Sequence, residues 1–550
     1  MRARGLDDGF GATGGPGNSA WGRKGNNRQM YKYTMGQFSI LLRAGLALII
    51  VAAAVFMGDV RGADAGDAPE IAREGLQWFN VAKPVPIASL RGRVVILDFW
   101  TEGCINCIHI IPILRGIEQK FPEQVVVIGV HSPKFAEEKS AGSVKDAIDR
   151  YEIAHPIVHD PAMSIWRDYG VEAWPTLVVV GPDGTILARL AGEPDPEQFT
   201  KAIGDLVAHA GQAGGLKPAR LALQPESRPK GRFLFPGKIK PLPGDRPQWV
   251  LADSGHNQIV VLDDAGNDVR RYGSGKAGFD NGSAASATFD HPQGLVAGAD
   301  AIFVADTGNH AIRRIDRATG AVTTIAGTGK RGTLLGAKSQ PGTAIALASP
   351  WDLERRDGRL FFANAGTHQI GAIDLAAGSV ARLAGSGAEA LQSGSADAAA
   401  FAQPSGLALS RDGATLYVAD AESSAIRAIA LGADNATRTL VGAGLFDFGK
   451  ADGTFEAARL QHPLGVAVDG DQLLVADTYN SRVRTLDLKR KVVSQFDGGK
   501  FTCIDPVCYP TREPAGISVA SSDRILLVDT GNHRVEEYRP SLKTFHTWAR

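Results

Sequence analysis

Four cysteines are the residues of this 550-residue chain whose chemistry depends most on spacing, and they fall in two close pairs. Cys104 and Cys107 follow an apolar run of strand length, Val94–Trp100, and precede apolar residues at helical spacing. The first cysteine therefore stands where a strand passes into a helix N-terminus, and unpaired N–H groups and the helix dipole stabilise a thiolate there. This placement predicts thiol–disulfide exchange, in which the first thiolate attacks and the second cysteine resolves the mixed disulfide.

A Cys-x-x-Cys pair can also be half of a zinc site, but a zinc site needs further Cys or His ligands at suitable spacing. His109 is close in sequence, yet it lies on the next helical turn and no partner pair follows in this region. We therefore prefer redox chemistry to metal binding for Cys104 and Cys107, and we expect no metal or other cofactor.

The second pair, Cys503 and Cys508, lies near the C-terminus in an expected loop. In an oxidising compartment such a close pair favours a local structural disulfide, although a second redox pair and two free thiols remain open. The pair lacks the strand-to-helix setting of Cys104, so we do not expect it to be catalytic.

The elements around the first pair follow an α/β order. A second apolar strand is expected at 125–130, a helix at about 143–151, a strand at 177–180 closed by a Gly-Pro-Asp-Gly turn, and a final amphipathic helix at 197–209. Two segments, Asp98-Phe-Trp100 before the cysteines and Gly170-Val-Glu-Ala-Trp-Pro175 after them, resemble the thioredoxin superfamily.

That resemblance implies roles for individual residues. Asp98 matches the buried acid that helps to deprotonate the resolving cysteine, although a structural hydrogen-bonding role is the alternative. Pro175 matches the cis-proline that faces the cysteine pair, and Trp100 and Trp174 are expected at the substrate groove.

This sequence also departs from the family. The tryptophan that usually precedes the first cysteine is replaced by Gly103, and the dipeptide between the cysteines is Ile105-Asn106 instead of Gly-Pro. A changed dipeptide changes the reduction potential in a direction that the sequence does not define.

A Val-Ala-Asp signature recurs through the second half of the chain. Its key residue returns six times, at Asp253, Asp306, Asn364, Asp420, Asp477 and Asp529. Six repeats of this length, each with four strand-like segments, predict a β-propeller. A residue required in every blade most simply folds a turn, and we expect the same of His310, His368 and His533.

The wording Val-Ala-Asp-Thr-Gly-Asn-His resembles the NHL repeat family of propellers. The order of a thioredoxin-like region and six such repeats resembles the NHL-repeat-containing protein 2-like family, including its bacterial relatives. We therefore expect a thioredoxin-like domain at 66–212, a Gly/Pro/Lys-rich linker at 213–232 and a six-bladed propeller at 233–550.

Residues 1–65 are expected to hold a disordered lead and a targeting segment. An uncharged apolar run, Ala44–Met57, follows Arg43 and precedes the small-x-small pattern Ala63-Asp64-Ala65, which predicts a cleaved signal peptide. An uncleaved membrane anchor over Phe38–Met57 is the alternative. Either way the rest of the chain is expected outside the cytoplasm, periplasmic or otherwise exported, and it meets the membrane only through an uncleaved anchor.

Lys plus Arg and Asp plus Glu each total 59, so the chain lacks the basic excess of a nucleic-acid-binding protein. The sequence predicts a thiol–disulfide oxidoreductase whose propeller is a binding platform for protein substrates or redox partners. A non-catalytic scaffold with a vestigial thioredoxin-like fold is one alternative, and metal-dependent lyase or lactonase chemistry in the propeller is another.

Overall fold

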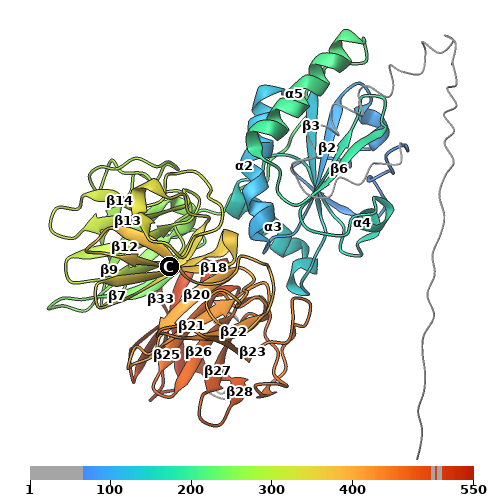
Figure 1. Ribbon diagram of the computed structural model, residues 1–550. Coiled ribbons are helices and arrows are strands. Elements are labelled where there is room, and N and C mark those ends of the chain that lie inside the picture. Colours follow the sequence, from blue (N-terminus) through green and yellow to red (C-terminus); the bar gives the residue numbers. More distant parts are fainter. Residues whose placement is uncertain (1–65, 497–501, 504–510) are drawn as a thin grey trace, which may run out of the picture. The chain divides into compact units, whose positions relative to one another are not determined.

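A computed structural model describes residues 66–496, 502–503 and 511–550, which all belong to one compact unit of the chain. It contains an α/β domain followed by a six-bladed β-propeller (Figure 1). The expected signal or anchor segment lies outside the described residues, as does Cys508 of the second cysteine pair. Among the described residues, no helix is both long and apolar enough to cross a membrane.

The α/β domain is built on one six-stranded mixed sheet in the order β1-β4-β3-β2-β5-β6. Its central strands are wholly buried, which explains why their sequences are continuous apolar runs. The parallel pairs are β2 with β3 and β3 with β4, and the remaining pairs are antiparallel. The strands are β1 (Gln77–Phe79), β2 (Val94–Trp100), β3 (Val125–His131), β4 (Ile157–His159), β5 (Thr176–Val180) and β6 (Ile186–Ala191).

Helices of this domain begin after residues whose side chains cap the helix N-terminus. Asp195 accepts a hydrogen bond from the N–H of Gln198 at the start of α5, where proline occupies the first turn. The helices are α2 (Ile105–Lys120), α3 (Ala141–Tyr151), α4 (Ser164–Asp168) and α5 (Pro196–Gln212), and a short 3₁₀ helix, η2 (Glu137–Lys139), precedes α3. The expected helices at 143–151 and 197–209 are therefore present.

The segment after α5 contains no helix or strand up to residue 238. Its backbone is nevertheless hydrogen-bonded to the α/β domain, because the N–H of Lys217 donates to Gly92 O at 2.7 Å and the N–H of Gln224 donates to Asn80 O at 2.8 Å. The expected linker thus lies against the domain that it leaves.

Each propeller blade is an antiparallel sheet of four consecutive strands, with a short extra edge strand in blades three, five and six. The inner strands of neighbouring blades are adjacent, and those of the last and first blades also meet. The first three blades contain β7 (Ile239–Leu242), β8 (Gln248–Asp253), β9 (Gln258–Asp263), β10 (Asp268–Tyr272); β11 (Leu295–Ala297), β12 (Ala301–Asp306), β13 (Ala311–Asp316), β14 (Val322–Ala326); and β15 (Gln340–Pro341), β16 (Pro350–Arg356), β17 (Arg359–Asn364), β18 (Gln369–Asp374), β19 (Ser379–Ala384). The last three contain β20 (Pro404–Leu409), β21 (Thr415–Asp420), β22 (Ala425–Ala430), β23 (Thr437–Val441); β24 (Gly453–Thr454), β25 (Gly465–Asp469), β26 (Gln472–Asp477), β27 (Arg482–Asp487), β28 (Val492–Gln495); and β29 (Thr502–Cys503), β30 (Pro514–Ser521), β31 (Arg524–Asp529), β32 (Arg534–Arg539), β33 (Thr544–Ala549).

The repeated aspartates fold turns, as the sequence predicts. In blade two, Asp306 accepts a hydrogen bond from the N–H of Asp290 at 2.8 Å, which ties the loop that enters the blade to the end of β12. Its other oxygen accepts from Asn309 at 2.9 Å and from the fully buried guanidinium of Arg313 at 2.7 Å. The equivalent carboxylates repeat this backbone contact in the other blades, at Asp253, Asp420, Asp477 and Asp529.

The three repeated histidines are also turn residues, and each one joins its blade to the next. They adopt positive φ angles between 51° and 56°. Each Nδ1 accepts a backbone N–H from the neighbouring blade: His310 from Ser349 at 3.1 Å, His368 from Gln403 at 3.1 Å and His533 from Phe235 at 3.0 Å. The last of these contacts links blade six to blade one.

Candidate redox site between the thioredoxin-like domain and the propeller

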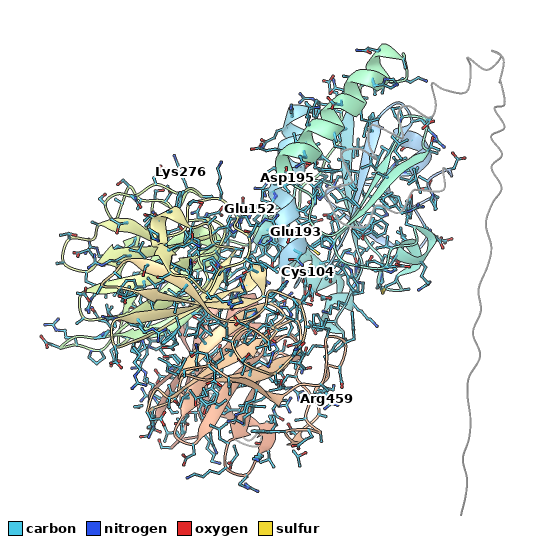
Figure 2. All side chains as sticks on the ribbon, viewed as in Figure 1. Cys104, Glu152, Glu193, Asp195, Lys276 and Arg459 are labelled. Carbon is cyan, nitrogen blue, oxygen red and sulfur yellow. The ribbon has the colours of Figure 1, made fainter. Side chains whose placement is uncertain are left out.

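Cys104, labelled in Figure 2, occupies the N-cap position of α2. Its Sγ accepts a hydrogen bond from the N–H of Cys107 at 3.2 Å. Both cysteines are free thiols; Cys104 is 8% exposed and Cys107 is 1% exposed. Burial and the hydrogen bond to Cys104 raise the pKa of the Cys107 thiol well above its usual range. Cys104 is therefore the more accessible thiol, while Cys107 requires a base before it can react.

Asp98 lies on β2, in the strand that leads to the cysteines, and its side chain is buried. Among the residues that the structure describes, its Oδ1 has no hydrogen-bond partner. Burial raises the pKa of Asp98 to about 7, although the charge of His155 acts in the opposite direction. The charge of Asp98 in turn raises the pKa of Cys107. A carboxyl group with this pKa can take or give a proton near neutral pH. Its proton-transfer role stays a prediction.

The Trp174–Pro175 peptide bond is cis, as the sequence predicts. Trp174 is partly buried; its Nε1 donates to Ser132 O at 2.8 Å and its ring lies 4.5 Å from that of Trp166. These contacts hold the tryptophan against α4 and the segment that follows β3.

Trp100 does not have the expected place at a groove. Its side chain is 2% exposed, belongs to the apolar cluster that contains both cysteines, and packs edge-on against His131 at 5.0 Å. The residue lies in a central strand with no open face, so its side chain supports the cysteines from within the core.

Glu138, on η2, is a site residue that the sequence analysis missed. Its carboxylate accepts backbone N–H groups from Gly103 at 3.2 Å, Lys134 at 2.7 Å and Phe135 at 2.8 Å. Burial raises the pKa of Glu138 to about 7. The carboxylate thereby joins the loop after β3 to the residue that precedes Cys104. In the sequence, the feature that could have pointed to Glu138 is its position shortly after the His-Ser-Pro-Lys-Phe segment.

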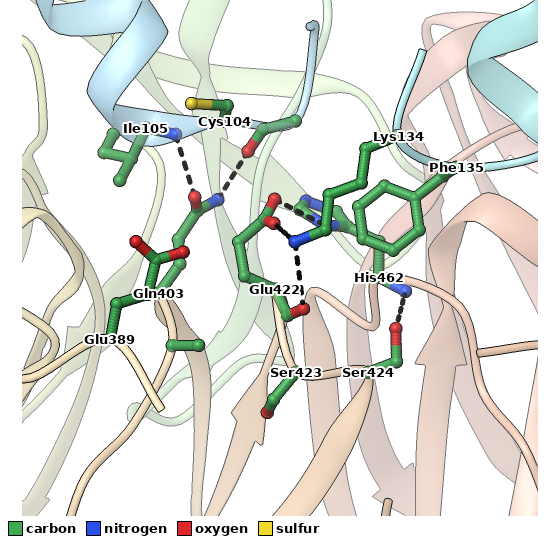
Figure 3. Close-up of polar contacts among 12 residues, drawn as sticks. Cys104, Ile105, Lys134, Phe135, Glu389, Gln403, Glu422, Ser423, Ser424 and His462 are labelled. Carbon is green, nitrogen blue, oxygen red and sulfur yellow. Dashed lines mark hydrogen bonds and ion pairs between the residues drawn. The ribbon is translucent and has the colours of Figure 1, made fainter. Parts of the chain in front are cut away.

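Gln403, at the entrance to blade four, binds both sides of Cys104 (Figure 3). Its Nε2 donates to Gly103 O at 2.8 Å, and its Oε1 accepts the N–H of Ile105 at 2.8 Å. Gln403 is 1% exposed. The loop that carries the first cysteine is therefore held by the propeller.

Lys134 and Glu422 form a buried ion pair beside this contact (Figure 3). Burial alone would lower the pKa of Lys134, but the Glu422 carboxylate outweighs it and holds that pKa above its ordinary value. The charges of Glu389 and Cys104 act on Lys134 in the same direction. A cation thus lies within electrostatic reach of the first cysteine, already paired with a propeller carboxylate.

Gln403 is one of six equivalent residues, one per blade, that each precede a proline and adopt a positive φ between 44° and 57°. We call these residues the pre-proline ring: Phe235, His291, Ser349, Gln403, His462 and Glu513. Every member contacts the thioredoxin-like domain, on Arg150 (Phe235, His291, Glu513), His109 (Ser349), Gly103 and Ile105 (Gln403) or Phe135 (His462). A positive φ is unusual for non-glycine residues, so contacts within and between the blades must hold this backbone conformation in place.

The ring explains the glycine before the first cysteine. A Cβ on Gly103 would lie 2.8 Å from Tyr479 Oη and 2.9 Å from His462 Cε1. Propeller side chains thus leave little room for a side chain at this position.

His109 contacts side chains of both domains, Glu193 of the thioredoxin-like domain and Ser349 of the propeller. Its Nε2 lies 2.8 Å from Ser349 Oγ and its Nδ1 lies 3.1 Å from Glu193 Oε1. Burial and the charge of Arg331 lower the pKa of His109 to about 3. Within the part of the chain that the structure describes, no group of His, Cys, Asp and Glu side chains could hold a metal ion.

A cavity of about 410 Å³ lies next to the cysteine helix. Its walls include Ile105, Ile108 and Pro112 of α2 and His310 and Trp351 of the propeller. Its size falls within the range of small-ligand pockets, and its lining is largely apolar.

Comparison with known proteins agrees with both parts of the fold. The thioredoxin-like family model matches residues 92–186, and the NHL repeat model matches residues 460–486 and 511–538. NHL repeat-containing protein 2 of Bos taurus is 37% identical over 86% of this chain and 70% of its own length, and that of Homo sapiens is 36% identical over 84% and 69%. Thiol-disulfide oxidoreductase ResA of Bacillus anthracis is 26% identical over 21% of this chain and 65% of its own length.

Proposed function

This chain belongs to the family of NHL repeat-containing protein 2, and on that premise we propose that it is a thiol–disulfide oxidoreductase that uses Cys104 and Cys107. The observation that carries the proposal is the position of the Cys104 sulfur at the start of α2, where it accepts the N–H of Cys107 at 3.2 Å. A helix N-terminus stabilises the thiolate that attacks a disulfide. The likeness to a thiol-disulfide oxidoreductase over the thioredoxin-like region supports the same chemistry.

Reduction of a partner's disulfide would take two steps. The Cys104 thiolate attacks one partner sulfur, the partner's S–S bond breaks, and the other partner sulfur leaves as a thiolate that takes a proton from solvent. Cys107 then gives its proton to Asp98 and attacks Cys104. The mixed disulfide breaks, the partner leaves as a dithiol with two more electrons, and Cys104 and Cys107 are left as a disulfide. The same steps in reverse would oxidise a partner dithiol.

The propeller would serve as the platform that selects protein partners. Its pre-proline ring forms a wall beside Cys104, and the apolar cavity along α2, which begins at Ile105, offers space for partner side chains. A partner that reaches Cys104 must therefore fit beside propeller residues as well as the Pro175 loop.

One observation favours the second candidate, a non-catalytic scaffold. Cys104 is only 8% exposed, and Gln403 covers the backbone on both sides of it. In this candidate the thioredoxin-like domain would be a structural partner of the propeller, and its thiols would not exchange with other proteins.

The experiment that separates the candidates is equilibration of the full chain with glutathione redox buffers. Mass spectrometry of alkylated peptides would follow Cys104 and Cys107 separately from Cys503 and Cys508. A reversible two-electron couple that disappears in Cys104→Ser but persists in a Cys503→Ser/Cys508→Ser variant supports the oxidoreductase. The absence of a couple, with Cys104 inert to glutathione in the folded chain, leaves the scaffold.

We further propose that the chain is exported, with its N-terminal segment either cleaved or kept as an anchor. The support is the apolar run Ala44–Met57 followed by Ala63-Asp64-Ala65. Fractionation of the producing cells and N-terminal sequencing would test this: a soluble exported form starting near Gly66 indicates cleavage, a membrane-bound exported form indicates an anchor, and a cytoplasmic form refutes the proposal.

A further inference from the structure

We infer that Gln403 is a positioning residue of the redox site, supplied by the propeller, whose side-chain amide fixes the two peptide groups that flank Cys104. This inference rests on the proposed function and adds to it a specific residue outside the thioredoxin-like domain.

The geometry uses both ends of the amide. Nε2 donates to Gly103 O and Oε1 accepts from the N–H of Ile105, each at 2.8 Å (Figure 3). A hydroxyl group cannot span the two sites, a carboxylate cannot donate, and an ammonium group cannot accept, so a carboxamide is the side chain suited to both contacts. The Gln403 amide thus binds the peptide groups immediately before and after Cys104.

Gln403 is itself held rigidly. Its side chain is 1% exposed, and its own N–H donates to Nδ1 of His368 at 3.1 Å. The next residue is Pro404, which begins the inner strand β20. A rigid support of this kind is what a positioning group needs, because a mobile amide would not hold the cysteine loop.

The contact bears on the chemistry of Cys104 through the start of α2. The first N–H groups of a helix have no partner within the helix and stabilise a nearby anion. Of these groups, the N–H of Cys107 donates to the Cys104 sulfur, whereas that of Ile105 is taken by Gln403. Gln403 thereby sets which donors face the sulfur. Because both cysteines are thiols here, the contact belongs to the reduced form.

The other ring residues do not touch the peptide groups beside Cys104 in this way. Gln369 of blade three provides a matched control, because it is also a buried glutamine whose side-chain amide binds backbone groups, those of Leu335 and Gly385 within the propeller. The charged and titratable groups around the Cys104 loop include Lys134, Glu138, Asp98, Glu102 and Cys107 of the thioredoxin-like domain and Glu389, Glu422, His462 and Tyr479 of the propeller.

The first test compares wild type, Gln403→Leu and Gln369→Leu as full chains in glutathione redox buffers. Loss of the contacts beside Cys104 should shift the dithiol–disulfide equilibrium of Gln403→Leu by about tenfold, or about 30 mV for a two-electron couple. Gln369→Leu should remain close to wild type. An unchanged equilibrium in folded Gln403→Leu, or an equal shift in Gln369→Leu, would overturn the inference.

The second test does not depend on redox activity. The rate of alkylation of Cys104, followed by mass spectrometry of its peptide across a pH series, reports the pKa of its thiol. Gln403→Leu removes both contacts to the peptide groups beside Cys104, so the midpoint of the alkylation profile should move by about one pH unit relative to wild type. An unmoved midpoint in the folded variant would refute the role of Gln403. The absence of any redox couple in the wild type would refute the proposed function alone.

Discussion

The Nδ1 atom of His533 in the last blade accepts the backbone N–H of Phe235 in the first blade at 3.0 Å, and the two rings pack edge-on at 4.5 Å. The same contact joins other neighbouring blades, but this one joins the two ends of the propeller. Phe235 also packs against Arg150 of the thioredoxin-like domain. The same residue therefore takes part in closing the propeller and in the contact between the two domains.

His533→Ala should weaken propeller closure. The substitution leaves the N–H of the buried Phe235 without its acceptor, which costs about 1–3 kcal/mol. Urea unfolding followed by tryptophan fluorescence would measure the loss, since Trp249 of blade one and Trp548 of blade six lie 6.3 Å apart. His209→Ala, on the exposed side of α5, is the control and should not change stability. Equal stability of the two variants would contradict the prediction.

Asp98→Asn should stabilise the protein at alkaline pH. The pKa of Asp98 is raised to about 7 in the folded chain, so ionisation favours the unfolded state. The stability that the protonated carboxyl group contributes is complete below its unfolded pKa and is lost as the pH rises through about 7. Urea unfolding at about pH 8 should show a gain of about 2–4 kcal/mol, fading toward about pH 4. A gain independent of pH would show that ionisation is not its cause.

Gly103→Ala should destabilise the contact between the domains. The new Cβ would meet Tyr479 Oη at 2.8 Å and His462 Cε1 at 2.9 Å, and such overpacking costs about 1–3 kcal/mol. Thermal unfolding would measure the loss. Removing the nearest atom with Tyr479→Phe should make the alanine less harmful, so the double variant should lose less than the sum of the single losses. Simple additivity would indicate that the two side chains do not meet.

Removal of one partner of the Lys134–Glu422 pair should be strongly destabilising. Both side chains are buried, with exposed fractions of 6% and 5%. Lys134→Met or Glu422→Gln would leave an unpaired buried charge, at a cost of about 3–5 kcal/mol. The double variant Lys134→Met/Glu422→Gln should recover part of this cost, and chemical denaturation of all four proteins would give the coupling. A double variant as unstable as the sum of the single variants would show that the pair contributes no coupling.

Several features could be predicted from local sequence because their causes are local. The strand-to-helix position of Cys104 follows from apolar spacing, and the turn role of Asp306 and His310 follows from recurrence in every blade. Trp100 shows the limit of this reasoning: its place in a family motif suggested a groove, but side chains of α2 and α3 pack with it in one apolar cluster and keep it in the core.

The sequence by itself determined the two folds, the cysteine pair at a helix start and the residues that close each blade, since each depends on neighbours along the chain. Only the tertiary structure decided that Gln403 holds the peptide groups beside Cys104, that Glu422 pairs with Lys134 and that Gly103 leaves room for Tyr479. These partners lie hundreds of residues apart in sequence. No periodicity links them, because they meet only when the propeller ring closes and its pre-proline residues converge on one face.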